Sequence, residues 1–358
     1  MALTTKAMKA DLPWFQTGLL CAVVLGLTPA FTLAGEARDP GDTAPAKAFS
    51  DANWISMNPS ANEAVLAAVV DGSGNLYIGG GFTAVGNVIA NRIAKWDGSS
   101  WTSLGTGLNS WVNALAVSGS DLYAAGPFTT AGGNAANFIA KWDGSAWTAL
   151  SSGLNGEVYA LAVSGGDIYA GGAFTKAGGV AANYFAKWNG SSWTALGSGM
   201  NNYVRALAVS GSDLYTGGDF TRVGSIVANY IAKWDASSWS PLGSGMSGPP
   251  PSVSALVVSG NDLYAGGFFR RAGGKKSAYV ARAYLPALPT LSVRRSGTDV
   301  MVSWPSADTT GFALEQAGPL AAPANWVPNT ASVADDGANK SVTLPATDSP
   351  QFFRLRRR

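Results

Sequence analysis

The chain has 358 residues, of which only 13% are charged and 11% are aromatic, and it carries 45 glycines and a formal net charge of +2. Disordered chains have few aromatic residues and a high net charge, so this composition excludes that class and instead predicts a β-protein with tight turns. We also expect no nucleic-acid binding, because neutralising phosphates requires a concentrated basic surface.

The N-terminus is typical of an export signal. Two lysines precede an apolar run that ends in small residues, where a signal peptidase could cut after Ala34 or Ala37. Pro29 interrupts the run and no stop-transfer charge cluster follows, which favours cleavage over a membrane anchor. We predict a signal peptide at 1–34 and a flexible linker at 35–50. The mature protein would be secreted, periplasmic or on a bacterial cell surface, without membrane insertion.

A unit of 46 residues then recurs, most cleanly over 157–202. Tryptophans mark two positions in each of four units, namely Trp96, Trp142, Trp188 and Trp234, and then Trp101, Trp147, Trp193 and Trp239. Each unit contains four short apolar runs bounded by turn residues, which predict four strands, A to D. A period of this size is typical of a β-propeller blade or a solenoid coil.

The strand count favours a closed propeller over an open solenoid. Five A, five B and five C strands are predicted, but the last unit stops after its C strand at Tyr284. A single D-like strand, 53–57, stands before the first unit, and its Trp54 matches the second tryptophan of the other units. Pairing it with the last unit would remove both free sheet edges. We therefore predict that residues 51–285 form a five-bladed β-propeller closed by an N-terminal strand.

The repeat stops before the C-terminal segment, where six or seven shorter strands predict a small β-sandwich at 289–358. This segment resembles a fibronectin type III or immunoglobulin-like module through Trp304, near the end of an early strand, and through an aromatic final strand at 352–355. We expect it to space or attach the propeller.

The B strands end in a diglycine, at Gly79-Gly80, Gly171-Gly172, Gly217-Gly218 and Gly266-Gly267. With the following C-strand aromatic and D-strand tryptophan, this pattern resembles the kelch-type propeller repeat. It is also similar to repeats of fungal cortical polarity-marker proteins and of many exported bacterial proteins, although the second unit has Ala125-Gly126. Kelch-type propellers are mostly binding scaffolds and some are enzymes, so the resemblance implies either role.

Positions that recur in every unit are expected to maintain the blade. The aspartates before the B strands should cap the A–B turns, and they are Asp121, Asp167, Asp213 and Asp262. The asparagines that begin the C strands should hydrogen-bond to turns, and they are Asn91, Asn137, Asn183 and Asn229. The tryptophans should pack within or between blades.

Positions that differ between units could form one binding site. Near the start of the A strands they include Trp111, Asn113, Tyr159, Tyr203 and Arg205, which we predict to bind a ligand. Aromatic, amide and guanidinium groups around a pore mouth suit a sugar or a peptide. Ordinary surface variation is the alternative interpretation.

These observations predict a monomeric, non-catalytic scaffold that binds a glycan or a protein and uses no cofactor or metal. The chain has no histidine, and its only cysteine, Cys21, lies in the export signal, so histidine-dependent triads and copper-oxidase chemistry are excluded. A glycoside hydrolase using Glu157 and Asp219 is one alternative, although we expect Asp219 to form an ion pair with Arg222. A lectin with one site per blade and a purely structural or adhesive protein are the others.

Overall fold

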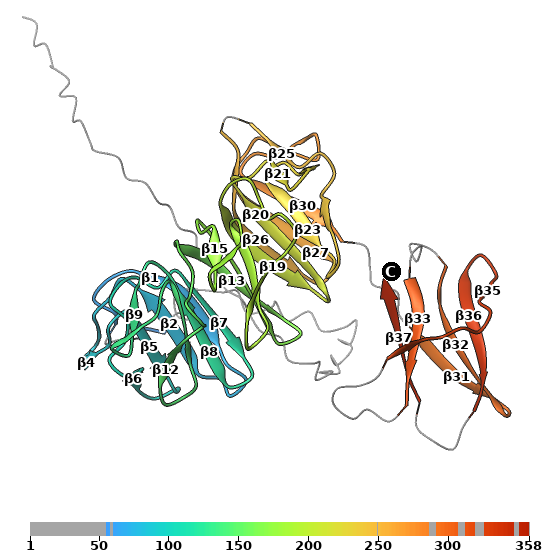
Figure 1. Cartoon of the computed structure of the whole chain (residues 1–358), viewed down its shortest axis with the longest axis horizontal. Coiled ribbons are helices and arrows are strands. Elements are labelled where there is room, and N and C mark those ends of the chain that lie inside the picture. The colour runs from blue at the N-terminus through green and yellow to red at the C-terminus, as the bar shows by residue number, and fades with distance from the viewer. Residues whose placement is uncertain are drawn as a thin grey trace, which may run out of the picture. The chain divides into compact units, whose positions relative to one another are not determined.

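The structure is a computed structural model that describes residues 55–57, 60–248, 250–285, 291–306, 312–318, 326–346 and 351–357. All regular structure in these ranges is β-strand, so the predicted all-β class is confirmed (Figure 1). The chain divides into two compact units, with the boundary between Ala283 and Tyr284. Each unit is described by itself below.

In the N-terminal unit, each of the first four repeats forms an antiparallel sheet with its A, B, C and D strands side by side. The first sheet contains β1 (Val65–Val70), β2 (Leu76–Gly80), β5 (Ile93–Trp96) and β6 (Trp101–Ser103). The second contains β7 (Ala114–Ser118), β8 (Asp121–Ala125), β11 (Ile139–Trp142) and β12 (Trp147–Ala149). The third contains β13 (Val158–Ser164), β14 (Asp167–Gly172), β17 (Phe185–Trp188) and β18 (Trp193–Ala195). The fourth contains β19 (Val204–Ser210), β20 (Asp213–Gly218), β23 (Ile231–Trp234) and β24 (Trp239–Pro241).

The fifth sheet has three strands among the described residues, β26 (Ser252–Ser259), β27 (Asp262–Phe268) and β30 (Val280–Tyr284). The D strand predicted to complete it is not present there. Asn53 and Trp54 of that predicted strand lie outside the described residues, as do the predicted signal peptide and linker, whereas Ile55–Met57 are described and form no strand. Closure of the ring therefore stays a prediction.

The B–C connections fold into small hairpins because paired glycines or other turn residues reverse the chain within two residues. The hairpins pair β3 (Ala84–Val85) with β4 (Val88–Ile89), β9 (Thr130–Ala131) with β10 (Asn134–Ala135), β15 (Lys176–Ala177) with β16 (Val180–Ala181), and β21 (Arg222–Val223) with β22 (Ile226–Val227). The last hairpin, β28 (Arg271–Ala272) and β29 (Lys275–Lys276), is joined by β25 (Met246–Ser247).

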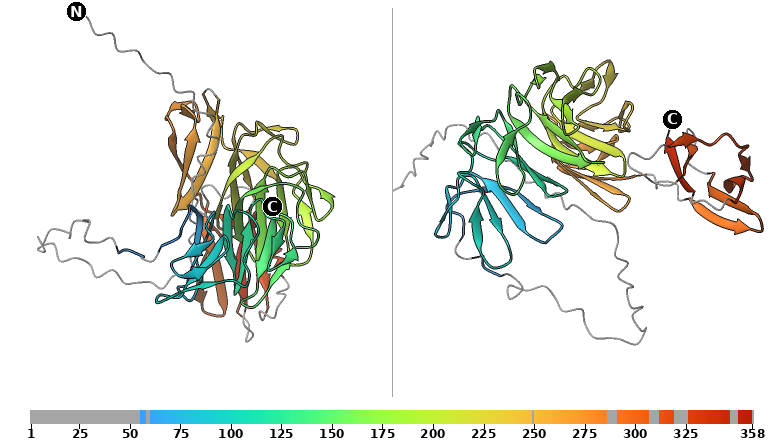
Figure 2. Two further views of the ribbon diagram at one scale, coloured as in Figure 1. Left: turned by 90° about the vertical axis from the view of Figure 1, so that its left-hand side faces the viewer. Right: turned by 60° about the horizontal axis from the view of Figure 1, so that its bottom comes forward.

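The A strands β1, β7, β13, β19 and β26 adjoin one another in chain order (Figure 2). Small residues let these strands approach closely. A valine at or near the start of an A strand is fully buried against the B strand of the preceding sheet, as Val112 is against Gly79 and Val204 against Gly171. The apolar core is therefore shared between neighbouring sheets.

A β-bulge interrupts the pairing of the A and B strands near the start of the A strand. In the fourth sheet Val204 pairs with Gly218 and Ala206 with Gly217, so Arg205 is the extra residue. The third sheet has the same irregularity at Tyr159, and the first and fifth have it at Leu66 and Ser254. Bulges redirect side chains and are common beside functional sites.

The tryptophans pack in pairs across the C–D hairpins, as predicted. Trp142 and Trp147 have ring centroids 5.5 Å apart at an interplanar angle of 50°, and the other three pairs match closely. In addition, Trp147 Nε1 donates a hydrogen bond of 2.8 Å to the Leu104 carbonyl of the preceding sheet. The tryptophans thus join neighbouring sheets as well as neighbouring strands.

The C-terminal unit contains two antiparallel sheets that share one core. One sheet has the order β31 (Ser292–Ser296), β32 (Asp299–Pro305), β36 (Asn339–Pro345) and β35 (Ala334–Asp335). The other has the order β34 (Val327–Pro328), β33 (Phe312–Ala317) and β37 (Phe352–Arg357). Trp304 of β32 is buried with Val302, Leu314 and Val342. The tryptophan that carried the sequence resemblance is therefore a core residue.

Candidate functional site

The recurring polar side chains have structural partners. Each asparagine at the start of a C strand donates to a carbonyl in the following turn, as Asn137 Nδ2 does to Ser152 at 3.1 Å, which confirms the prediction. The expected aspartate caps are wrong: Asp121 instead pairs with Lys141 Nζ of the C strand at 2.9 Å. The equivalent aspartates of the next three repeats pair in the same way. The reason is that each aspartate begins the B strand, beside the C strand rather than over the turn.

The variable residues meet because they lie near the same end of adjoining A strands. Tyr159 and Arg205 are bulge residues of β13 and β19, and Asn113 immediately precedes β7. Each bulge residue stands outside the regular pairing, so the pleat of the strand does not fix the direction of its side chain. We call this end of the A strands the rim.

Arg205 is held by an ion pair at the rim. Its Nε lies 2.9 Å from both carboxylate oxygens of Asp219, and its Nη2 lies 2.6 Å from Oδ2. Ser252 Oγ of the fifth sheet also donates to Asp219 Oδ1 at 2.6 Å. The hydrogen bond to Asp219 raises the pKa of Arg205, so the guanidinium remains charged. The expected pairing of Asp219 with Arg222 is therefore wrong, and Arg222 donates instead to the Ser225 carbonyl.

Two tyrosine rings flank Arg205, and a third packs against one of them. The Arg205 guanidinium carbon lies 5.6 Å from the ring centroid of Tyr159 and 5.9 Å from that of Tyr203, within the range of cation–π attraction. Tyr203 meets Tyr159 edge to face at 6.2 Å and Tyr184 at 5.7 Å. Arg205 therefore positions the rings instead of serving as a free cation for an anionic ligand.

A second polar group adjoins these rings. Asn113 is buried, and its Nδ2 donates to Glu157 Oε1 at 2.9 Å and to the Val158 carbonyl at 3.2 Å. Burial, together with the charge and the hydrogen bond of Glu157, raises the pKa of Tyr159 to about 12. The polar row thus runs through Asn113, Glu157, Tyr159, Arg205, Asp219 and Ser252, from the second sheet to the fifth.

The raised pKa of Tyr159 predicts a dependence of stability on pH. The folded state favours the neutral phenol, so this contribution to stability is fully present below the ordinary tyrosine pKa of 10.0 and is lost as the pH rises towards about 12. We expect the free energy of unfolding, measured by urea titration, to fall between pH 9 and pH 11.5. The fall should be smaller in Tyr159→Phe than in the unmodified protein. Tyr284→Phe, which removes an exposed hydroxyl, is the matched control. Equal losses in all three proteins would contradict the assignment.

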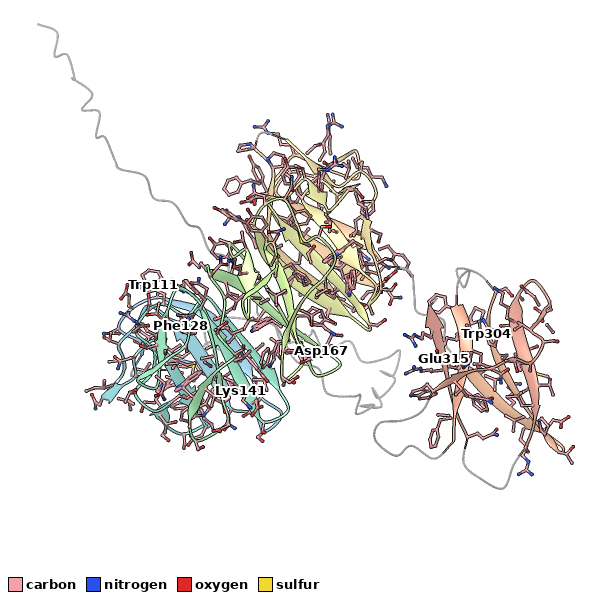
Figure 3. All side chains as sticks on the ribbon, viewed as in Figure 1. Trp111, Phe128, Lys141, Asp167, Trp304 and Glu315 are labelled. Carbon is pink, nitrogen blue, oxygen red and sulfur yellow. The ribbon has the colours of Figure 1, made fainter. Side chains whose placement is uncertain are left out.

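Trp111 lies at a neighbouring part of the rim (Figure 3). A Cβ placed on Gly81 would lie 3.4 Å from Trp111 Cε2 and 3.2 Å from the carboxyl carbon of Glu63, so the indole and this carboxylate converge over Gly81. Trp111 is 42% exposed and Tyr203 is 38% exposed. The structure thus joins four of the five predicted residues in one network and places Trp111 beside Glu63.

Sequence reasoning missed Tyr184 and Ser252. Tyr184 has a φ of 65°, and Arg92, Phe138, Tyr230 and Tyr279 take the same left-handed conformation in the other repeats. A bulky residue in this region is strained and needs support from its surroundings. Here the Tyr184 amide donates to Phe174 O at 2.8 Å, and its carbonyl accepts from Gly172 at 3.1 Å. The recurring large residue after each C-strand asparagine was the available signal.

Among the described residues, no group of three or more histidine, cysteine, aspartate or glutamate side chains is arranged to hold a metal. In the same part of the chain, no helix has the length and apolarity needed to cross a bilayer.

Comparisons with known proteins add little to this geometry. No family model and no curated protein matches the sequence. Among solved structures, the chain is similar to the computationally designed Ika4 protein, with 19% identity, a TM-score of 0.36, and coverage of 51% of this chain and 98% of that chain. This likeness carries no argument about function, so the site is interpreted from its own residues.

Proposed function

We propose that the protein is an exported, non-catalytic binding scaffold that recognises a neutral glycan at the rim. The observation that carries the proposal is the network in which Arg205 and Asp219 fix the ring of Tyr203, while Tyr203 and Trp111 stay partly exposed. An aromatic face can stack on the C–H face of a sugar while nearby amide and carboxylate groups accept and donate hydrogen bonds. Because Asp219 balances the charge of Arg205 and Glu157 adds a second acidic group, the site disfavours an anionic ligand and suits a neutral one.

The scaffold that we propose is a kelch-like, five-bladed propeller closed by the N-terminal strand and followed by a fibronectin III-like sandwich. Five consecutive sheets with adjoining A strands support this architecture. A rigid ring would hold the rim residues in place before the ligand arrives, which reduces the entropic cost of binding.

A single rim site is better supported than one site per blade. The recurring asparagines and aspartates that could form repeated sites are engaged in turns and ion pairs. A glycosidase role is less well supported, because Glu157 already accepts from Asn113 and Asp219 accepts from Arg205 and Ser252. Catalysis would require one of these carboxyl groups to donate a proton to the leaving group. The other would have to attack the sugar ring or activate a water molecule.

A glycan array followed by calorimetric titration tests the proposal. We expect one equivalent of a neutral oligosaccharide to bind and Tyr203→Ala to weaken binding by about 10 to 30-fold, since stacked aromatic residues dominate such contacts. Val180→Ala, at an exposed hairpin position, is the matched control and should leave affinity unchanged.

Three results would contradict this function. Several bound equivalents would favour one site per blade, and release of reducing ends from a bound glycan would show a hydrolase. Absence of binding across the array would favour a protein ligand or a structural role.

A further inference from the structure

Three of the four interior boundaries between sheets repeat one steric fit. A valine at or near the start of an A strand occupies the space left by a glycine of the preceding B strand, so that a Cβ on that glycine would collide with the valine side chain. The pairs are Gly79 with Val112, Gly171 with Val204 and Gly217 with Val253. In the second sheet Ala125 takes the glycine position, and Val158 is still fully buried. The fit is thus a property of the repeat.

The first and the fifth sheets, at the two ends of the series, each have one member of this valine–glycine contact without its partner. Val65, which begins the A strand of the first sheet, is 42% exposed, whereas Val112, Val158, Val204 and Val253 are all 0% exposed. At the other end, a Cβ on Gly266 would come no closer than 3.7 Å to any described atom outside its chain neighbours. The free valine and the free glycine are therefore complementary.

A second A-strand position is also buried in the interior sheets and exposed in the last sheet. Three alanines, Ala116, Ala162 and Ala208, lie in the A strands of the second, third and fourth sheets and are 1%, 2% and 8% exposed. Ala116 and Ala162 belong to core clusters that contain the A strand of the following sheet. The equivalent residue of the fifth sheet, Val257, is 50% exposed. The face that carries Val257 is thus an apolar surface that a following sheet would cover.

A third contact that lacks one partner is a hydrogen bond from a tryptophan indole. Trp147, Trp193 and Trp239 donate from Nε1 to carbonyls of the preceding sheet, at Leu104, Leu150 and Leu196, over 2.8 to 3.0 Å. Trp101 Nε1 is equally buried but has no acceptor among the described residues. A buried donor without a partner is destabilising, because it has lost its hydrogen bonds to water without gaining others.

The sequence identifies the missing acceptor. Leu104 and Leu150 each stand three residues after a D-strand tryptophan, at Trp101 and Trp147, and Met57 stands three residues after Trp54. Met57 also precedes Val65 by eight residues, the interval by which Leu104 precedes Val112, the equivalent valine of the second repeat. By this register, the Met57 carbonyl is the equivalent acceptor for Trp101.

We infer that the first sheet covers the free face of the fifth sheet in the same molecule, with Val65 seated on Gly266 and against Val257, and with Trp101 Nε1 donating to the Met57 carbonyl. This inference rests on the proposed five-bladed architecture but not on glycan binding. Both halves of each contact belong to one chain, so joining them costs only loop closure, whereas joining two molecules also costs translational and rotational freedom.

Paired alanine variants test whether the face is covered. Val65→Ala should lower the melting temperature as much as Val112→Ala, by about 3–8 °C, because both would remove buried methyl groups from an inter-sheet contact. If the first sheet were uncovered, Val112→Ala alone would be destabilising, and an unchanged melting temperature for Val65→Ala would overturn the inference.

A size exchange identifies the partner of Val65. Gly266→Val should lower the melting temperature as Gly217→Val does, by about 3–8 °C, and adding Val65→Ala to Gly266→Val should recover about half of that loss. A harmless Gly266→Val, or a double variant whose losses simply add, would contradict seating of Val65 on Gly266.

Sedimentation velocity at several concentrations of the full chain separates closure from association. Closure within one molecule predicts a monomer whose melting temperature does not depend on concentration. A dimer or larger assembly that dissociates with Gly266→Val would show that the two faces join between copies, which overturns the inference. The glycan titration is independent: a closed monomer that binds no glycan would refute only the proposed function.

Discussion

Phe174→Ala is expected to lower the free energy of unfolding of the N-terminal unit by about 3–5 kcal/mol and its melting temperature by about 10 °C. The side chain is fully buried between the second and third sheets, in a cluster that includes Ile139 and Val158. Its removal would lose apolar burial and leave a cavity that rigid sheets on both sides fill poorly. Thermal denaturation followed by circular dichroism measures the effect.

The matched control is Phe268→Ala, because Phe268 is 67% exposed and its truncation removes little buried surface. We expect its melting temperature to stay within about 2 °C of the unmodified protein. Similar losses for both variants would mean that burial in the described structure does not govern stability at these positions.

Gly172→Ala is expected to destabilise the same unit by about 3 kcal/mol. A Cβ at this position would collide with the Glu157 carbonyl oxygen, which accepts a 2.7 Å hydrogen bond from the Ala173 amide. The collision is with backbone atoms of Glu157 and Val158, just before the bulge at Tyr159, so the strain cannot relax through a side-chain rotation. Chemical denaturation with urea provides the free energy.

Gly72→Ala is the control for this second variant, since no atom lies within 4 Å of the added Cβ. It should change stability by no more than about 0.5 kcal/mol. A Gly172→Ala protein as stable as this control would contradict the close backbone approach that defines the bulge.

The sequence predicted the repeated sheets because its period, glycine turns and paired tryptophans act locally. Trp142 and Trp147 flank a four-residue turn in which Asp143 Oδ1 accepts from the amides of Ser145 and Ala146. Contacts between residues so close in sequence determine a hairpin whatever the rest of the chain does. They also explain why the role of the recurring asparagines could be predicted from their places beside turns.

The partners within the site could not be predicted, because they depend on a bulge and on contacts between sheets. Arg205 and Asp219 are 14 residues apart and meet only because the bulge in β19 leaves Arg205 unpaired beside the end of β20. Asn113 and Glu157 come from different repeats altogether. Proximity in sequence pointed to Arg222, whose side chain is instead used within its own hairpin.

The same bulge explains why the first glycine of the diglycine varies between repeats and the second does not. The second glycine is present in all five repeats, because its Cβ would meet a backbone carbonyl, as at Gly126 and Gly172. The first glycine faces a valine side chain of the next sheet, and Ala125 shows that this neighbour can adjust. Steric contact with backbone and contact with a side chain thus impose different constraints on neighbouring residues.

The extra residue in four of the A strands also has a consequence for how such a repeat diversifies. Because it stands outside the strand ladder, this residue can change its chemistry without disturbing the register on either side. Leu66, Tyr159, Arg205 and Ser254 occupy it in four repeats, an apolar, an aromatic, a cationic and a hydroxyl side chain on nearly identical backbones. Duplicated copies of one gene segment could therefore acquire new recognition surfaces by single substitutions, and a laboratory library randomised at these positions would sample binding specificities on an unchanged framework.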